Sequence, residues 1–321
     1  MFRIGNDLVA LVSDTACDLP EEVLAQYDIR LVSLRVVTSQ GEFRDRMEIN
    51  ADQVYEIMKA ELPKTSLPLP EDVSALYRQL KEEGATRILH ICMSGSLSGT
   101  YNMVSILADA TDDLHVDVVD TQTLSCGTGL LVLEAAECLQ SGMPVEDVIA
   151  RLTELRKHQL GAFVIRTLEF LRKGGRIGLV EGVVGSLLQI KPVIYVNDDG
   201  VYATLIKARG FGKALSAMQE EFFKRYQGRK VRVAIVHGAA FEEAKALLET
   251  FRQKLDVVSD LIAPVSPALA IHTGPGLLGA IVQYADKEDF NSSACQMSNS
   301  IQYEMAQLLC GNCAEIYFLG C

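Results

Sequence analysis

Three loops of this 321-residue chain bring hydroxyl and carboxyl groups to the ends of expected strands. They are Asp14-Thr15, Asp120-Thr121 and the Ser/Gly-rich stretch Ser94–Thr100, which leads from a strand into a helix. Ligands of open parallel sheets bind beyond the carboxyl ends of the strands. A loop that opens a helix also offers free backbone N–H groups, which favour an anion. The same residues suit an ordinary N-cap, so the loop alone leaves anion binding and capping equally open.

A further candidate is His272, which is followed by Thr273, Gly274, Pro275 and Gly276. A histidine in an apolar stretch is more often a satisfied core residue than a ligand. Here the small residues let a backbone approach closely, Thr273 adds a hydroxyl, and imidazole is a frequent functional group. The sequence leaves both roles open.

Motifs of enzymes fit this chain poorly. A nucleophile elbow needs serine at the centre of Gly95–Gly99, where Leu97 stands. Arg209–Ala214 lacks the first glycine and the Ser/Thr of a phosphate-binding loop. The enzymatic alternative to a binding protein is an esterase or thioesterase, with Ser94 or Ser96 as nucleophile and His272 as base.

The elements that hold the first loops alternate between strand and helix patterns. Apolar runs at Leu8–Asp14 and Arg87–Met93 are typical of strands buried on both faces. This order predicts an N-terminal parallel sheet with helices on both faces. Further strands are expected at 29–37 and 116–120, and helices at 19–27, 51–62, 71–83, from about 98, at 127–139 and at 145–158.

The second half has a different pattern. Two strands, Lys191–Val196 and Val201–Lys207, flank the turn Asn197–Gly200 and predict a hairpin. Helices at 213–226 and 241–255 and strands at 231–237 and about 257–262 complete an α+β region. We therefore expect an α/β protein of two domains, residues 1–160 and 161–286, with an extension at 287–321.

Composition narrows the class of protein. Apolar residues make up 49% of the chain, which excludes wholesale disorder, and a net charge of −12 disfavours nucleic acid as a partner. The segment Leu261–Ala285 carries no charged residue, but prolines and glycines break it into what we expect to be a buried strand, loop and helix. No export signal is evident at the N-terminus, so we expect a cytoplasmic protein that does not span the membrane.

Eight cysteines are expected to be reduced thiols. Cys310 and Cys313, with Cys295 and Cys321, could form a zinc site or a redox pair. Their spacing lacks paired zinc knuckles and no histidine lies nearby, so we expect packed thiols and no metal.

Six stretches, taken in order, resemble the DegV family of bacterial fatty-acid-binding proteins. Together they span residues 8 to about 286. They are Ser13–Pro20, Thr65–Pro68, Ser94–Tyr101, Leu171–Ile177, Lys207–Gly210 and His272–Gly276.

This resemblance implies a long-chain fatty acid buried between two lobes. Its carboxylate would lie among the Thr-Ser loop, the Ser-rich loop and the closing histidine. Hydroxyl and N–H donors meet the cost of burying a carboxylate, and each buried CH₂ of the tail contributes about 0.8 kcal/mol. The matching positions here are Thr65, Ser66, Ser94, Gly95, Ser96, His272 and Thr273.

The resemblance also implies a protein without catalytic residues or cofactor. Such proteins present the fatty acid to a separate ATP-dependent fatty acid kinase, and the acyl phosphate enters phospholipid synthesis, with transient contact to a membrane surface. Arg176 and Arg209 match positions linked to that kinase or to the phosphorylated head group. The chain departs from the family pattern at Ala16, Leu67, Leu69 and Gly95, where the family usually has threonine, glutamine, serine and serine.

Overall fold

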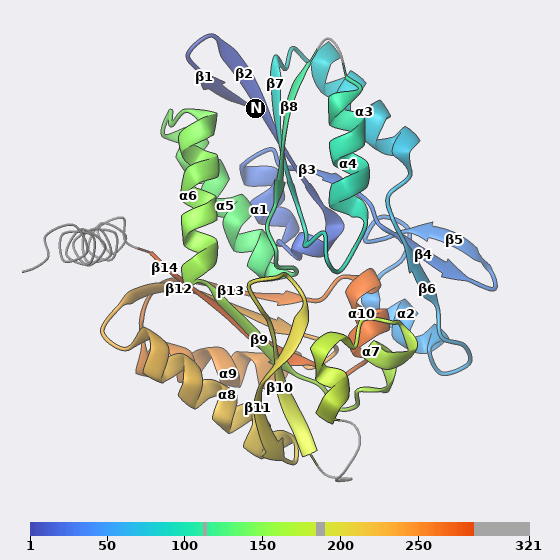
Figure 1. The fold of residues 1–321 in the computed structure, drawn as a ribbon, viewed down its shortest axis with the longest axis vertical. Helices are drawn as coiled ribbons and strands as arrows, with labels where there is room; N and C mark the ends of the chain where they lie inside the picture. Colours follow the sequence, from blue (N-terminus) through green and yellow to red (C-terminus); the bar gives the residue numbers. More distant parts are fainter. Residues whose placement is uncertain (112–113, 184–189, 286–321) are drawn as a thin grey trace, which may run out of the picture. The chain divides into compact units, whose positions relative to one another are not determined.

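The structure is a computed structural model that describes residues 1–111, 114–183 and 190–285. It has the predicted α/β architecture, with three sheets and their covering helices (Figure 1). Residues before 160 form the first and third sheets, and residues 160–284 form a six-stranded sheet. A domain boundary at residue 160 stays a prediction. The extension at 287–321, with Cys295, Cys310, Cys313 and Cys321, lies outside the described residues.

The first sheet places the carboxyl ends of its central strands at one edge. Its strands β2, β3, β7 and β8 are parallel, as predicted, and β1 pairs antiparallel with the first half of β2. Asp14 ends β2 and Asp120 ends β8, so the three candidate loops lie together. The bounds are β1 (Phe2–Ile4), β2 (Asp7–Asp14), β3 (Arg30–Val32), β7 (Arg87–Cys92) and β8 (His115–Asp120).

Helices cover both faces of this sheet (Figure 1). On one face, Ala10 and Val12 of β2 share an apolar cluster with Val73 and Tyr77 of α3. On the other face, α5 packs closely, because a Cβ at Gly129 would lie only 2.4 Å from the carbonyl oxygen of Cys17. The helices are α1 (Glu21–Gln26), α3 (Pro70–Glu82), α4 (Thr100–Asp109), α5 (Cys126–Gln140) and α6 (Val145–His158).

The six-stranded sheet has the order β11-β10-β9-β14-β12-β13 and is antiparallel except for the β12–β13 pair. Alternate residues of β9 point to opposite faces of this sheet. Ala162 and Val164 pack with α8 and α9, whereas Phe163 belongs to the cluster on the opposite face. The bounds are β9 (Leu160–Val164), β10 (Ile190–Val196), β11 (Tyr202–Arg209), β12 (Lys230–His237), β13 (Asp256–Pro264), β14 (Leu278–Tyr284), α8 (Phe211–Tyr226) and α9 (Phe241–Lys254).

The single strand expected at 29–37 is wrong, because the chain changes sheet inside it. After β3, the Ser33 hydroxyl donates to the Asp45 carbonyl at 2.6 Å and the Leu34 N–H donates to Thr15 Oγ1 at 3.1 Å. These bonds hold the break, and the chain continues into a small third sheet that the sequence did not predict. That sheet comprises β4 (Arg35–Thr38), β5 (Gly41–Arg44) and β6 (Lys64–Ser66). The helix α2 (Ala51–Ile57) lies between β5 and β6 in the sequence.

The segment 261–285 is divided, as predicted, into short pieces that include the end of β13 and the short helix α10 (Pro267–Thr273), but it ends in a further strand, β14, which the sequence did not predict. A second short helix, α7 (Glu169–Lys173), contacts α10. Among the described helices, none has both the length and the apolar character needed to cross a bilayer. The four cysteines of the described part, Cys17, Cys92, Cys126 and Cys138, are all buried.

The inner face of the six-stranded sheet shares one apolar cluster with the first and third sheets. Leu34, Met93 and Leu124 pack there with Phe163 and Val236. Segments far apart in the sequence therefore meet across this core, and both cavities described below open within it.

Candidate functional site

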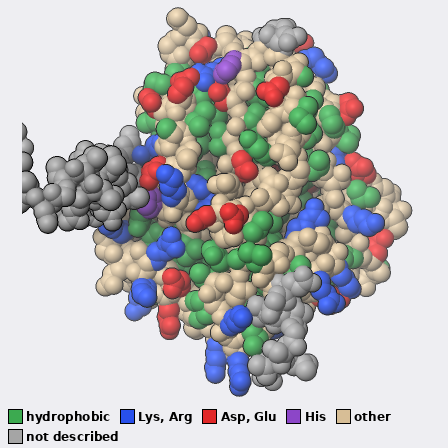
Figure 2. Space-filling model, viewed as in Figure 1, with side chains coloured by type: hydrophobic (Ala, Val, Ile, Leu, Met, Phe, Trp, Pro, Cys, Tyr) green, Lys and Arg blue, Asp and Glu red, His purple; other side chains and the backbone are tan. Residues whose placement is uncertain are grey.

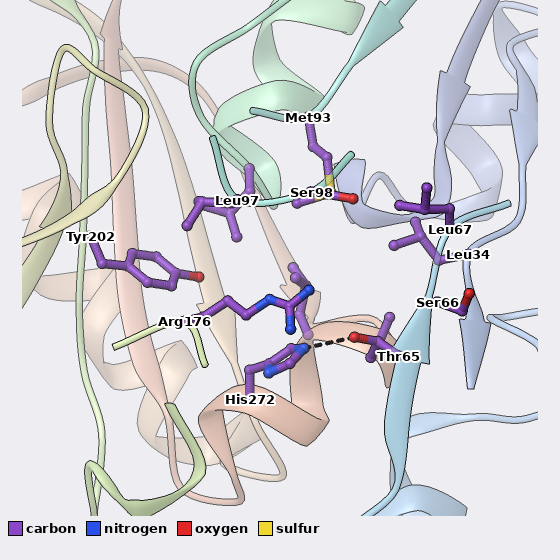
Figure 3. Close-up of a pocket in the computed structure, with 13 residues that line it drawn as sticks. Leu34, Thr65, Ser66, Leu67, Met93, Leu97, Ser98, Arg176, Tyr202 and His272 are labelled. Carbon is purple, nitrogen blue, oxygen red and sulfur yellow. Dashed lines mark hydrogen bonds between the residues drawn. The ribbon is translucent and has the colours of Figure 1, made fainter. Parts of the chain in front are cut away.

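A cavity of about 220 Å³ lies where β6, the Ser/Gly loop, α10 and the segment after α7 meet (Figure 3). Its polar wall is formed by Thr65, Ser66, Ser98, Arg176 and His272. The remainder is apolar and comprises Leu34, Leu67, Met93, Leu97, Leu124, Tyr202, Ala268 and Leu269.

Thr65 and His272 meet across this cavity. Thr65 is the central residue of β6, held opposite Val36 of β4, and His272 lies in the last turn of α10. The distance between Thr65 Oγ1 and His272 Nε2 is 2.9 Å, and the dashed line in Figure 3 marks this bond. The two residues predicted to act together are thus brought together across 207 positions of sequence.

The environment keeps His272 neutral. The side chain is 8% exposed, and burial lowers its pKa to about 4, with the charge of Arg176 acting in the same direction. Its Nδ1 has no hydrogen-bond partner and faces Gly174, where a Cβ would lie only 2.2 Å from that nitrogen. A glycine at 174 is therefore what leaves room for the imidazole.

Arg176 supplies a positive charge to the cavity wall. One of its guanidinium nitrogens, Nη1, donates to the carbonyl of Gly174 at 2.7 Å. In Figure 3 the guanidinium reaches toward the Thr65–His272 pair. A fixed cation beside hydroxyl donors suits a carboxylate or a phosphate.

A second, narrower cavity of about 40 Å³ adjoins the first, because Leu124, Tyr202 and Leu269 line both. Its wall is mostly the apolar inner face of the six-stranded sheet, including Phe163 and Ile281. Thr273 also lines it, but the hydroxyl of that residue already donates to the Leu269 carbonyl at 3.0 Å. We call the first cavity the polar chamber and the second, which shares these three wall residues with it, the apolar channel.

The first three residues of the Ser/Gly loop lie outside both cavity walls. The Ser94 hydroxyl donates to the Gly200 carbonyl at 2.8 Å, and the Ser96 hydroxyl donates to the Asp199 carbonyl at the same distance. These two bonds, called the clasp below, hold the turn of the β10–β11 hairpin against the loop. Leu97 and Ser98 line the cavity instead, so fatty-acid contacts of Ser94, Gly95 and Ser96 stay a prediction.

The sequence left anion binding and capping equally open for this loop, and in the structure the chain's own Asp120 carboxylate accepts from its backbone N–H groups. The Gly95 N–H lies 3.2 Å from both carboxylate oxygens of Asp120, and the Gln122 N–H donates to the same carboxylate at 2.8 Å. An external anion would have to displace Asp120 to use these donors.

Arg209 differs from Arg176 in its placement. It is exposed at the end of β11, opposite Ile190, and it lines neither cavity. Sequence reasoning also missed Ser98 and Tyr202 as wall residues. Ser98 belongs to the recognisable motif, whereas Tyr202 follows an ordinary turn and gave no signal.

The geometry disfavours the esterase reading. A serine nucleophile needs a hydrogen bond to its base. The hydroxyls of Ser94 and Ser96 instead donate to the carbonyls of Gly200 and Asp199, and His272 Nε2 is bonded to Thr65. Within residues 1–111, 114–183 and 190–285, no group of three His, Cys, Asp or Glu side chains is arranged to hold a metal ion.

Comparison with known proteins gives a consistent answer. Residues 8–285 match the family described as "Uncharacterised protein, DegV family". A fatty acid-binding protein of Thermotoga maritima is 32% identical over 291 residues, covering 87% of this chain and 99% of that protein. A fatty acid-binding DegV family structure from Thermus thermophilus is 34% identical with a TM-score of 0.81, covering 86% of this chain and 99% of that one. A stearic acid-binding protein structure from Eubacterium ventriosum is 26% identical with a TM-score of 0.79, covering 86% and 98%.

Proposed function

The chain belongs to the DegV family, and from this premise we propose that it binds a long-chain fatty acid. The carboxylate lies in the polar chamber beside Thr65, Arg176 and His272, and the hydrocarbon chain follows the apolar channel. The observation that carries this proposal is that a polar and an apolar cavity share the wall residues Leu124, Tyr202 and Leu269. Fatty acid binding by the relatives from Thermotoga maritima, Thermus thermophilus and Eubacterium ventriosum supports it.

The chemistry of the chamber suits a carboxylate. Arg176 neutralises its charge, and hydroxyl groups donate hydrogen bonds to its oxygens. We place the single proton of the neutral His272 imidazole on Nε2, so that the Nδ1 facing Gly174 is not left as an unpaired donor, and Nε2 then donates to Thr65 Oγ1. The hydroxyl hydrogen of Thr65 is then directed to the ligand, so His272 orients a donor rather than supplying a charge.

The channel provides affinity through burial of methylene groups, at about 0.8 kcal/mol for each CH₂. A cavity of about 40 Å³ is too narrow for a long acyl chain without movement of its wall. Rotamer changes at such interfaces are common on binding. We expect Phe163 and Tyr202, which pack edge to face with ring centroids 5.3 Å apart, to separate when the chain enters.

The proposal extends to presentation of the fatty acid to an ATP-dependent fatty acid kinase in the cytoplasm. The product, an acyl phosphate, would supply phospholipid synthesis, with transient contact of the protein to a membrane surface. On the face seen in Figure 2, basic side chains gather over the lower half of the molecule. The exposed Arg209 offers a cation outside the chamber for a partner or a phosphate.

Ligand extraction tests the binding proposal. Protein purified from a bacterial host is expected to release an intact long-chain fatty acid in stoichiometric amount, detected by mass spectrometry. Delipidation should lower the melting temperature, because a ligand that binds only the folded state stabilises it. Absence of fatty acid together with no thermal shift on adding one would contradict the proposal, and covalent labelling by a fluorophosphonate would favour the esterase.

Arg209→Ala tests presentation separately from binding. We expect unchanged fatty acid affinity but lower acyl-phosphate formation in an assay with the cognate kinase and ATP. The matched control is Arg172→Ala, because Arg172 is also an exposed arginine within residues 161–286. Full phosphorylation by the Arg209 variant would exclude this residue from the transfer step.

A further inference from the structure

The helix that carries His272 cannot cap its own beginning. The first N–H groups of a helix lack partners within it. In α10 the hydroxyl of the N-cap residue Ser266 makes no hydrogen bond, and Pro267 at the first position has no N–H. The N–H groups of Ser266 and Ala268 therefore need acceptors from elsewhere in the molecule.

Two buried carboxylates from the first 45 residues supply those acceptors. Asp18 Oδ1 accepts from the Ser266 N–H at 2.9 Å, and Asp45 Oδ1 accepts from the Ala268 N–H at 2.8 Å. Asp18 is 3% exposed and Asp45 is fully buried.

Asp18 is held in place by a constrained backbone and a second bond. It has a φ of +52°, a left-handed conformation that is unfavourable for residues other than glycine. Its other oxygen, Oδ2, accepts from the hydroxyl of Ser125, the residue that precedes α5. The cap of α10 is thus joined to the first sheet and to α5.

This attachment fixes the position of the imidazole. α10 has seven residues, fewer than two full turns, and all of them are buried. Its first turn is held by Asp18 and Asp45, and its last turn presents Nε2 of His272 to Thr65. A shift at the N-terminus of so short a helix moves the histidine with it.

We propose that Asp18 and Asp45 are positioning residues of the polar chamber, hereafter called the head-group chamber. They hold His272 against Thr65 because they cap α10 from a segment more than 200 residues earlier in the chain. This inference rests on the proposed function, because its consequence is selectivity for a carboxylate. Neither residue lines the 220 Å³ cavity, so each acts through the helix and not by contact with the ligand.

The decisive measurement is the ratio of affinities for hexadecanoate and for the alcohol of the same chain length. Asp18→Leu and Asp45→Leu remove the acceptors, and we expect each to reduce the preference for the acid at least tenfold while alcohol affinity changes less than threefold. Asp18→Asn and Asp45→Asn keep an oxygen that accepts the same N–H, so their preference should stay within threefold of the wild type.

Glu134→Gln provides the matched control. Glu134 is also buried and hydrogen-bonded, but it pairs with Arg151, joining α5 to α6 rather than to α10. We expect this variant to be less stable and to keep the wild-type ratio of affinities. If Glu134→Gln also lowered the ratio of acid to alcohol affinity, the effects of Asp18 and Asp45 would be explained by general destabilisation, and the inference would be overturned.

A second variant keeps the test decisive if the leucine variants do not fold. Ser266 has a φ of −58°, which proline adopts, so Ser266→Pro removes the N–H donor with little backbone change. We expect this variant to shift the ¹⁵N resonance of His272 Nε2 and to lower the preference for the acid. Unchanged values in Ser266→Pro would refute the positioning role, whereas a wild-type protein without any preference for the acid would refute the proposed function itself.

Discussion

The contact between His272 and Gly174 makes a glycine part of the head-group chamber. Gly174 has a φ of −78°, so alanine is compatible with the backbone there. Its methyl group would nevertheless lie 2.2 Å from His272 Nδ1, and the imidazole would have to move away. We expect Gly174→Ala to weaken fatty acid binding about tenfold or more, in the range of an overpacking cost of about 1–3 kcal/mol.

Isothermal titration with a defined fatty acid checks this expectation. Gly212→Ala is the matched control, because nothing lies within 4 Å of a Cβ at that position. Equal affinities of the two variants would mean that the ring of His272 does not contribute to the site.

Thr65→Val removes a hydroxyl and keeps the shape of the side chain. We expect a loss of about 1–3 kcal/mol in fatty acid binding, because His272 Nε2 and a ligand oxygen both lose a partner. Thr38→Val in the neighbouring strand serves as the control, since its hydroxyl donates to the Gly41 carbonyl and accepts from the Gln40 N–H, both within an exposed turn. Unaltered affinity in Thr65→Val would place the head group elsewhere.

The sequence predicted some of the residues that line the head-group chamber and was less successful with others. Thr65, Ser66 and His272 were identified through motifs and all line the cavity. The hydroxyl of Ser94 was expected there as well, but it bonds a carbonyl 106 residues away. A loop hydroxyl satisfies a ligand or a distant backbone oxygen equally well, and nothing in the local sequence distinguishes the two.

At the scale of the elements, the β10–β11 hairpin depends on Gly200, whose carbonyl accepts the hydrogen bond from the Ser94 hydroxyl. Gly200 has a φ of +75°, and a Cβ there would lie 2.3 Å from Ser94 Oγ. Gly142 has a similar φ of +84° with nothing within 4 Å of a Cβ, so it isolates the backbone penalty. We expect Gly200→Ala to destabilise the protein by about 1–3 kcal/mol more than Gly142→Ala, because only the former also breaks the clasp. Chemical denaturation of both variants measures the difference, and equal losses would argue against the clasp.

Long periodic elements were predicted well, and short ones were not. The apolar runs of β2 and β7 and the turn between β10 and β11 carry local signals that survive in the structure. β5 has four residues and β6 has three, and most of these positions are exposed, so no apolar pattern marks these strands. The break between β3 and β4 is held by Thr15 and Asp45, which lie more than ten residues away and leave no local pattern.

For the whole molecule, buried carboxyl groups predict an unusual dependence of stability on pH. Burial raises the pKa of Asp14 and Asp18 to about 7 and that of Asp45 to about 6. Unfolded aspartates titrate near 4, so between pH 4 and 7 the native state binds more protons and stability falls as pH rises. Burial lowers the pKa of His90 to about 3 and that of His272 to about 4, which gives the opposite trend below pH 6.5.

Above pH 6.5 the contribution of the histidines fades, because unfolded histidines, with a pKa near 6.5, lose their remaining protons, and the contribution of the aspartates dominates. We expect the free energy of unfolding to decrease from pH 6.5 to 8, measured by urea denaturation at constant ionic strength. Asp14→Asn should flatten this decrease, whereas Glu83→Gln, at a solvent-accessible carboxylate, should leave the slope unchanged. A stability that rises over this interval would show that the aspartates are ionised in the native protein.

The position of β14 has a consequence for how the chain is made. β14 is the last described strand, yet it lies inside the six-stranded sheet between β9 and β12. While the ribosome synthesises the chain from its N-terminus, β9 and β12 emerge without the neighbour that joins them. The apolar inner face of this sheet therefore stays accessible to chaperones until residue 284 has left the exit tunnel. The head-group chamber also needs α10, which lies just before β14, so it forms only at the end of synthesis.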